Sequence, residues 1–214
     1  MQGMGAGIKC TDGAEARVAH GPRRWHGGPL EGMMRIAVVG THGVGKTTLV
    51  EDFCAAHPGY EHVPEPYWLL AQQGVVFANG PTVADLEEQL KQSCALILAA
   101  NEADVVFDRC PLDLIAYLDV VGAAEGFEWS PDGKLLSRIE KALATLDLVV
   151  FVPLVHPDEI VASIEYPRLR TRVDARLKTM LREDDLGLLA DGPRFVEVSG
   201  TRPARVASME AALH

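Results

Sequence analysis

One segment near the beginning of the chain, residues 40–48, reads Gly-Thr-His-Gly-Val-Gly-Lys-Thr-Thr and fits the pattern G-x-x-x-x-G-K-[ST]. It follows an apolar run at residues 35–39 that is typical of a buried strand. A loop in this setting can wrap a polyphosphate if its backbone N–H groups point inward, and Gly40, Gly43 and Gly45 leave room for that approach. The segment predicts a nucleoside triphosphate site; the alternative is a glycine-rich turn that binds nothing.

Residues within this phosphate loop have separate expected roles. Lys46 is expected to reach the β- and γ-phosphates, and Thr47 to place its hydroxyl on Mg²⁺. A helix opening at Lys46 adds the positive end of its dipole beneath the phosphates. The residues expected to contact the nucleotide are Gly40, Thr41, His42, Gly43, Val44, Gly45, Lys46, Thr47 and Thr48.

The composition of the chain argues against nucleic acid and membranes as partners. The chain has 214 residues and a formal net charge of -10, which argues against nucleic acid because phosphate backbones are bound by clustered Lys and Arg. No apolar run reaches the roughly 18 residues of a membrane span, and none forms the core of a signal peptide. The four cysteines lack C-x-x-C spacing, which fits a reducing compartment. We therefore expect a cytoplasmic protein without a membrane partner.

The chain divides into a short extension and one domain. Residues 1–33 are rich in glycine and lack apolar periodicity, so we expect them to be disordered. Translation starting at Met33 or Met34 would leave the remaining fold, residues 34–214, complete. The oligomeric state is open, a homodimer included.

Short apolar strands alternate with helical segments through this domain. Strands are predicted at residues 35–39, 60–63, 104–107, 148–152 and 195–198. Helices are predicted at residues 46–56, 83–101, 112–121, 135–146, 158–164, 169–189 and 204–213, with a short turn at 68–73. This alternation predicts an α/β fold of three layers, with helices on both faces of a five-stranded, mostly parallel sheet. Ligands of such sheets lie beyond the carboxyl ends of the strands.

Glu65 follows the second predicted strand, between Pro64 and Pro66. The prolines stiffen the backbone on either side of the carboxylate. Glu65 is therefore a candidate general base that would take the proton from an acceptor hydroxyl as it attacks the γ-phosphate. A solvated glutamate in a proline-bracketed turn is the alternative.

The third predicted strand ends in Val-Val-Phe followed by Asp108 and Arg109. An aspartate after such an apolar run is typical of the carboxylate that holds Mg²⁺ in nucleotide-binding proteins, so Asp108 is the second expected metal ligand beside Thr47. Arg109 is expected to project toward the phosphates or the acceptor. Asp113 either orients Arg109 or begins the following helix.

Four arginines occur within nine residues after the fourth predicted strand: Arg168, Arg170, Arg172 and Arg176. A spacing of four places Arg168, Arg172 and Arg176 on one helical face. We predict a helical lid at about residues 156–182, with Arg168 and Arg172 contacting phosphate. An ordinary solvated face paired with acidic neighbours is the alternative.

Together and in this order, the phosphate loop, the Val63-Pro64-Glu65-Pro66 segment and the Asp108-Arg109-Cys110-Pro111 segment resemble the P-loop nucleoside kinases. The resemblance extends to deoxynucleoside kinases, thymidine kinases and the bacterial nicotinamide-riboside kinase type, often grouped with AAA-like ATPases, and spans about residues 35–205. It implies a P-loop NTPase fold that binds ATP and Mg²⁺, with Lys46, Glu65, Asp108 and Arg109 as catalytic residues. It also implies that Gln89 or Gln92 reads the base of the acceptor, unless they are plain surface residues.

The leading functional hypothesis is an ATP-dependent kinase acting on a hydroxyl of a nucleoside or similar small metabolite. Glu65 favours it, because a base has no use in a pure nucleotide sensor. The alternative is an AAA-like ATPase or nucleotide-binding regulator with no small-molecule acceptor. A GTPase is disfavoured because no Asn-Lys-x-Asp segment follows the expected strands.

Overall fold

The computed structural model describes residues 34–101, 104–155, 165–190 and 192–214. The predicted disorder of residues 1–33, the start at Met33, the predicted helix 158–164 and the first part of the lid therefore lie outside the described residues.

The core of the protein is a sheet of five parallel strands in the order β2-β3-β1-β4-β5. The strands are β1 (Arg35–Val39), β2 (Glu61–Val63), β3 (Val105–Asp108), β4 (Leu148–Phe151) and β5 (Arg194–Glu197). This confirms the predicted α/β sheet. Pairing of β1 with β3 sets Val38 opposite Asp108, so the loop after β1 begins beside that carboxylate.

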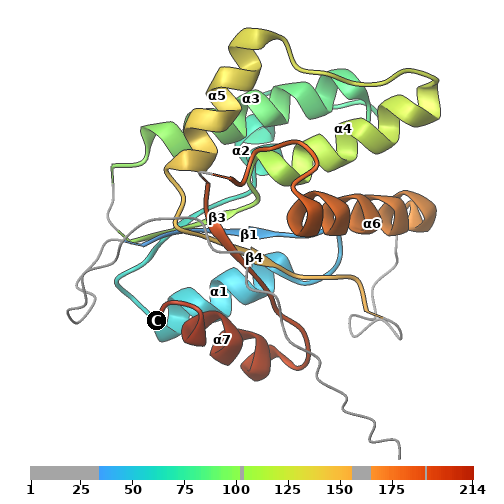
Figure 1. The fold of residues 1–214 in the computed structure, drawn as a ribbon. Coiled ribbons are helices and arrows are strands. Elements are labelled where there is room, and N and C mark those ends of the chain that lie inside the picture. Colours follow the sequence, from blue (N-terminus) through green and yellow to red (C-terminus); the bar gives the residue numbers. More distant parts are fainter. Residues whose placement is uncertain (1–33, 102–103, 156–164, 191) are drawn as a thin grey trace, which may run out of the picture.

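Helices cover both faces of the sheet (Figure 1). They are α1 (Lys46–Ala56), α2 (Pro66–Gln72), α3 (Val83–Ala99), α4 (Pro111–Glu125), α5 (Gly133–Ala144), α6 (Pro167–Glu183) and α7 (Arg202–Ala211). Alternate residues of β1 face opposite layers: Ile36 and Val38 pack with α1 and α7, whereas Ala37 and Val39 pack with the layer of α3 to α6. Both faces of this strand are therefore buried, as a central parallel strand requires.

Two helices end four or more residues away from the predicted position, α4 and α6. α4 continues four residues beyond Val121 and ends at Gly126, whose φ of 88° suits a glycine cap. α6 was expected to reach Leu189 but ends at Asp184, which has a φ of 46°. The apolar residues Leu186, Leu188 and Leu189 extended the helical pattern in the sequence, although they lie in the loop that follows.

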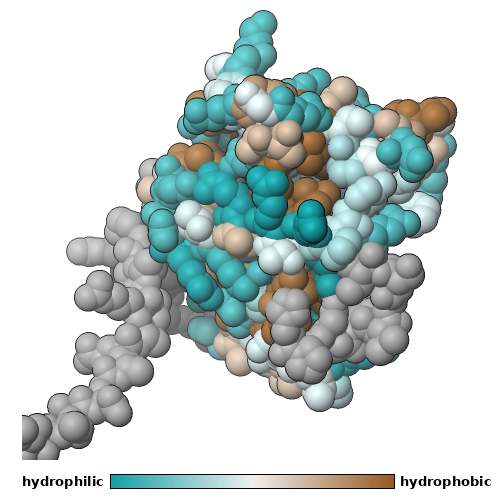
Figure 2. Space-filling view, turned by 90° about the vertical axis from the view of Figure 1, so that its right-hand side faces the viewer, coloured by the Kyte–Doolittle hydropathy of each residue, from teal (hydrophilic) through white to brown (hydrophobic). Residues whose placement is uncertain are grey.

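The face turned toward the viewer in Figure 2 is mainly hydrophilic, with hydrophobic residues exposed in small separate areas. Among the described residues, none of the helices combines the length and the apolar character that crossing a membrane would demand.

Candidate active site

The phosphate loop lies at the carboxyl end of β1 and leads into α1. A Cβ at Gly40 would come within 2.5 Å of the Val152 carbonyl oxygen, so no larger residue fits there without a shift of backbone. Gly45 caps α1 with a φ of 89°, a conformation that glycine adopts without strain. Both glycines are thus required by this path of the backbone.

Lys46 is buried at the start of α1, and its Nζ donates to the Thr41 carbonyl at 3.1 Å. Burial lowers the pKa of this ammonium, and the nearby charge of Arg109 lowers it further, against the opposing effect of Glu65. A buried ammonium held by one carbonyl is suited to a polyanion entering the loop.

Thr47 and Asp108 meet at the same edge of the sheet, where the Thr47 hydroxyl donates to Asp108 Oδ2 at 2.5 Å. The other carboxylate oxygen, Oδ1, is buried with no hydrogen-bond partner among the described residues. A hydroxyl oxygen and a carboxylate oxygen are the hard ligands that Mg²⁺ takes. These two residues therefore fit a magnesium site completed by phosphate oxygens.

Arg109 connects Glu65 to the phosphate loop. Its Nε pairs with Glu65 Oε1, and its Nη1 donates to Asp113 Oδ1 at 3.3 Å and to the Gly40 carbonyl at 3.4 Å. The backbone of Arg109 has a φ of 84°, which is uncommon for a residue with a side chain and is often found at functional sites. Its buried guanidinium also lies 5.5 Å from the centre of the Tyr117 ring.

Glu65 caps α2, and Pro66 begins that helix. Burial by itself would raise the pKa of Glu65, but the charges of Arg109 and Lys46 outweigh it and hold that pKa below its ordinary value. The carboxylate is therefore ionised at neutral pH. Glu65 lies at the same edge of the sheet as Lys46 and Asp108, where the carboxyl ends of the parallel strands meet.

Asp113 has both of the roles that the sequence left open. It accepts from the Cys110 N–H at 3.3 Å at the beginning of α4, and it contacts Arg109. Its Oδ1 also accepts from the Gly40 N–H at 2.8 Å, a contact that the sequence did not reveal. Asp113 thereby fixes α4 to the first residue of the phosphate loop.

Tyr117, one turn further along α4, is a second link to this loop. Its hydroxyl accepts from the His42 N–H at 2.9 Å and lies 2.8 Å from His42 Nδ1. Because His42 Nε2 lies 2.6 Å from the Glu165 carbonyl, which can only accept, Nε2 carries the proton and neutral Nδ1 accepts from Tyr117. Burial lowers the pKa of His42, and the charges of Arg109 and Lys46 act in the same direction against the Glu165 hydrogen bond.

Arg170 is the α6 arginine that contacts the phosphate loop. Its Nε donates to the His42 carbonyl at 2.8 Å and its Nη2 to the Gly43 carbonyl at 2.9 Å. Arg168 and Arg172, which were expected to contact phosphate, are exposed, whereas Arg176 pairs with Asp119. The position of Arg170 could have been found from the buried stripe it shares with Val173 and Leu177, at spacings of three and seven.

Arg205 on α7 is a loop contact that the sequence analysis missed. Its Nη1 donates to the Val44 carbonyl at 2.7 Å and its Nε to the Gly200 carbonyl at 2.8 Å. Arg205 lies 161 residues after Val44 in the sequence. No local sequence pattern indicates that it contacts the loop. The loop is thus contacted from α4, α6 and α7.

Two aromatic residues, Tyr67 and Trp68, follow Glu65 in the first turn of α2. The rings of Tyr67 and Phe77 stack with centres 4.6 Å apart, and Trp68 is 60% exposed. Of the two glutamines considered for base recognition, Gln89 donates to the Asp85 carbonyl of its own helix at 3.3 Å, and Gln92 is half-buried. Tyr67 and Trp68 are thus exposed on the helix that Glu65 precedes.

A family model described as an AAA domain matches residues 35–205. The sequence has no match among curated proteins. Its fold is similar to that of NadR protein in complex with NAD and AMP-PNP, with a TM-score of 0.58 and 18% identity over 84% of this chain and 49% of that chain. The chain thus spans about half the length of NadR.

Two further solved structures are similar over most of both chains. Thymidylate kinase from Candida albicans has a TM-score of 0.53 and 14% identity, over 86% of this chain and 92% of that chain. Deoxyadenosine kinase from M. mycoides with bound dATP has a TM-score of 0.55 and 14% identity, over 85% and 100% respectively. With the family match across most of its length, this chain belongs to the AAA domain family and has the P-loop fold shared with these nucleoside and nucleotide kinases.

Proposed function

We propose that this protein is a kinase that transfers the γ-phosphate of ATP to a hydroxyl of a nucleoside or similar small metabolite. The observation that carries the proposal is the ionised carboxylate of Glu65, paired with Arg109 beside the phosphate loop. A protein that only senses nucleotide does not need a base at this position.

Each residue of the site has a part in this transfer. Lys46 binds the β- and γ-phosphates, and Thr47 with Asp108 holds Mg²⁺, which neutralises charge on the phosphate oxygens. Arg109, which contacts both Glu65 and the Gly40 carbonyl, stabilises the transferred phosphoryl group in this proposal. Glu65 orients the acceptor hydroxyl and accepts its proton as the new O–P bond forms, while the bond to the ADP oxygen breaks.

The acceptor side is supported by the exposed aromatic residues of α2, the helix that begins directly after Glu65. An acceptor with a planar ring can pack against Tyr67, Trp68 or Phe77 while its hydroxyl reaches the carboxylate. The structures of similar fold include complexes with NAD, AMP-PNP and dATP, which agrees with a nucleotide donor here. Arg168 and Arg172 remain predicted phosphate contacts of the lid, alongside Arg170.

An assay of ADP release tests the proposal. The protein is incubated with ATP and Mg²⁺, with and without each member of a panel of nucleosides, nicotinamide riboside and simple alcohols. We expect ADP release to depend on one class of acceptor. The same rate without any acceptor would support the alternative, an AAA-like ATPase or nucleotide-binding regulator.

A further inference from the structure

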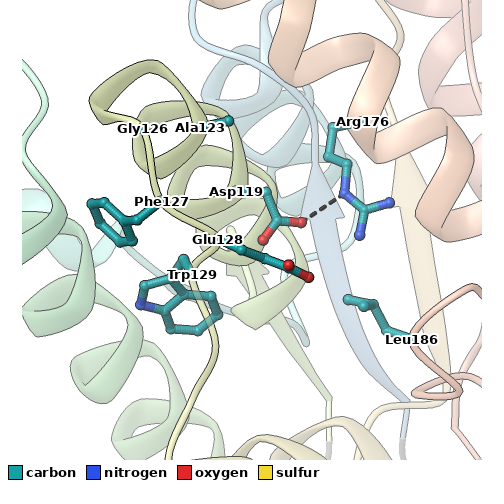
Figure 3. Close-up of a pocket in the computed structure, with 8 residues that line it drawn as sticks. All are labelled: Asp119, Ala123, Gly126, Phe127, Glu128, Trp129, Arg176 and Leu186. Carbon is teal, nitrogen blue, oxygen red and sulfur yellow. Dashed lines mark hydrogen bonds and ion pairs between the residues drawn. The ribbon is translucent and has the colours of Figure 1, made fainter.

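A second hollow of about 510 Å³ opens between the end of α4, the segment that follows it and α6 (Figure 3). Its volume falls within the range of small-molecule sites. None of the phosphate-loop residues, and neither Glu65 nor Arg109, lines it. It is therefore separate from the candidate active site.

Carboxylates dominate the charge of this pocket. Among the described residues, one cationic side chain lines it, Arg176, whose Nε contacts Asp119 Oδ2 at 2.6 Å and whose Nη1 contacts Asp185 Oδ2 at 2.5 Å. Glu128 forms no ion pair among the described residues, and Figure 3 shows its carboxylate pointing toward the space between Arg176 and Leu186. The lining thus carries two carboxylates and one guanidinium, and Glu128 is the carboxylate left without a cationic partner among the described residues.

Neighbouring carboxylates affect the pKa of Asp119. Burial raises the pKa of Asp119, Arg176 opposes this effect, and the charges of Asp185 and Glu128 raise that pKa further. α4 also ends at Gly126, so the negative end of its dipole points into the same region. A positive group entering the pocket would be attracted by the carboxylates and by the C-terminal end of α4.

Apolar surface borders the carboxylates. Phe127 and Leu186 are 43% and 44% exposed, and Figure 3 places the rings of Phe127 and Trp129 on one side of the carboxylates and Leu186 on the other. The Trp129 Nε1 donates to Glu87 at 2.9 Å, which fixes that ring. A ligand that matches this lining has a positive group and an apolar body.

The pocket is connected to the phosphate loop through two helices. The Asp119–Arg176 pair joins α4 to α6 at the pocket. The same two helices hold the phosphate loop, α4 through Tyr117 and α6 through Arg170. An occupant that contacts Asp119 therefore touches an ion pair that joins two of the three helices contacting the loop.

We propose that this pocket is an effector site for a small organic cation, whose ammonium or amidinium group is bound by Asp119 and Glu128 and whose apolar body packs against Leu186 and the aromatic rings. The proposal does not depend on the kinase activity proposed above, because it concerns a different set of residues. Its chemistry is recognition of charge and shape only, with no covalent step.

Calorimetric titration of the full chain with 2-phenylethylamine, 2-phenylethanol and phenylacetate tests the site, because the three probes share a ring and differ in charge. We expect saturable binding of the amine only. Glu128→Gln should weaken it about fivefold, the scale of one charge contact at an exposed site, and Leu186→Ala should weaken it as well. Glu125→Gln, an exposed carboxylate on α4 outside the lining, is the matched control and should leave the affinity unchanged.

Equal binding of the alcohol and the amine, or an affinity for the amine that Glu128→Gln does not change, would overturn the proposal that this pocket binds a cation. Repeating the titration with saturating ATP tests the link to the phosphate loop, because coupling between two sites is reciprocal. We expect the affinity for the amine to change by about fivefold. An identical affinity with and without ATP would overturn the effector role.

Discussion

The carboxylate of Glu65, at the end of β2, is paired with the guanidinium of Arg109, at the end of β3. The same guanidinium reaches the Gly40 carbonyl and Asp113, so one arginine joins the candidate base to the first residue of the phosphate loop. Arg109 and the contacts from Tyr117, Arg170 and Arg205 thus hold the loop from several directions.

Glu65→Gln should lower phosphoryl transfer by about 10²–10⁴-fold, the usual contribution of general base catalysis, because an amide cannot accept the proton. The affinity for ATP should change little, since Lys46 and the loop backbone are intact. Turnover and calorimetric ATP titration measure the two effects. Glu61→Gln, at an exposed position of β2, is the control. Wild-type turnover of Glu65→Gln would show that Glu65 is not the general base.

Arg170→Gln should weaken ATP binding by about tenfold, because the loop loses two hydrogen bonds from a charged donor. Arg168→Gln and Arg172→Gln, on the exposed side of the same helix, test the alternative that these two arginines contact phosphate. ATP titrations of the three variants separate two hypotheses. A loss confined to Arg168→Gln or Arg172→Gln would instead favour the phosphate contacts expected from the sequence.

Tyr117→Phe should lower the free energy of unfolding by about 1 kcal/mol, because the His42 N–H and Nδ1 both lose their partner. It should also weaken ATP binding by loosening the loop. Denaturant unfolding and ATP titration measure these effects. Tyr60→Phe is the control, because its hydroxyl makes no hydrogen bond with the described residues. Equal effects of the two substitutions would contradict the role of Tyr117.

The lowered pKa of Glu65 makes stability depend on pH in a definite direction. Since the folded-state pKa lies below the unfolded-state value, the unfolded chain binds the proton more readily, and acid favours unfolding. The contribution is complete well above about pH 4.3, the ordinary value for glutamate, and is lost as pH falls below it through the folded-state pKa. Melting temperatures of the wild type and Glu65→Gln should therefore converge under acid. A constant difference would show that the charge of Glu65 is not what stabilises the pair.

Much of this arrangement could be predicted from the sequence because parallel strands bring their carboxyl ends to one edge. Asp108 ends β3, Arg109 follows it directly and Glu65 lies two residues beyond β2, so their nearness required only the order of elements. The glycine motif also predicted the path of the loop backbone at Gly40 and Gly45.

Contacts made across the fold could not be predicted in this way. Arg205 reaches the loop from the last helix, and its contact depends on how α7 packs against α1. The choice among the α6 arginines depended on the helix's rotation, which places Arg170 inward and leaves Arg168 and Arg172 in solvent. The spacing of the arginines relative to one another did not predict that Arg170 points inward. The buried apolar residues of α6 determine which face of the helix packs against the domain.

The most direct test of the proposed kinase is to follow a labelled γ-phosphate from ATP in the presence of the acceptor that most stimulates ADP release. We predict that the label appears on a hydroxyl of the acceptor in amounts equal to the ADP formed, and that Glu65→Gln abolishes this product. Label recovered only as inorganic phosphate, at a rate that the acceptor does not change, would contradict the account.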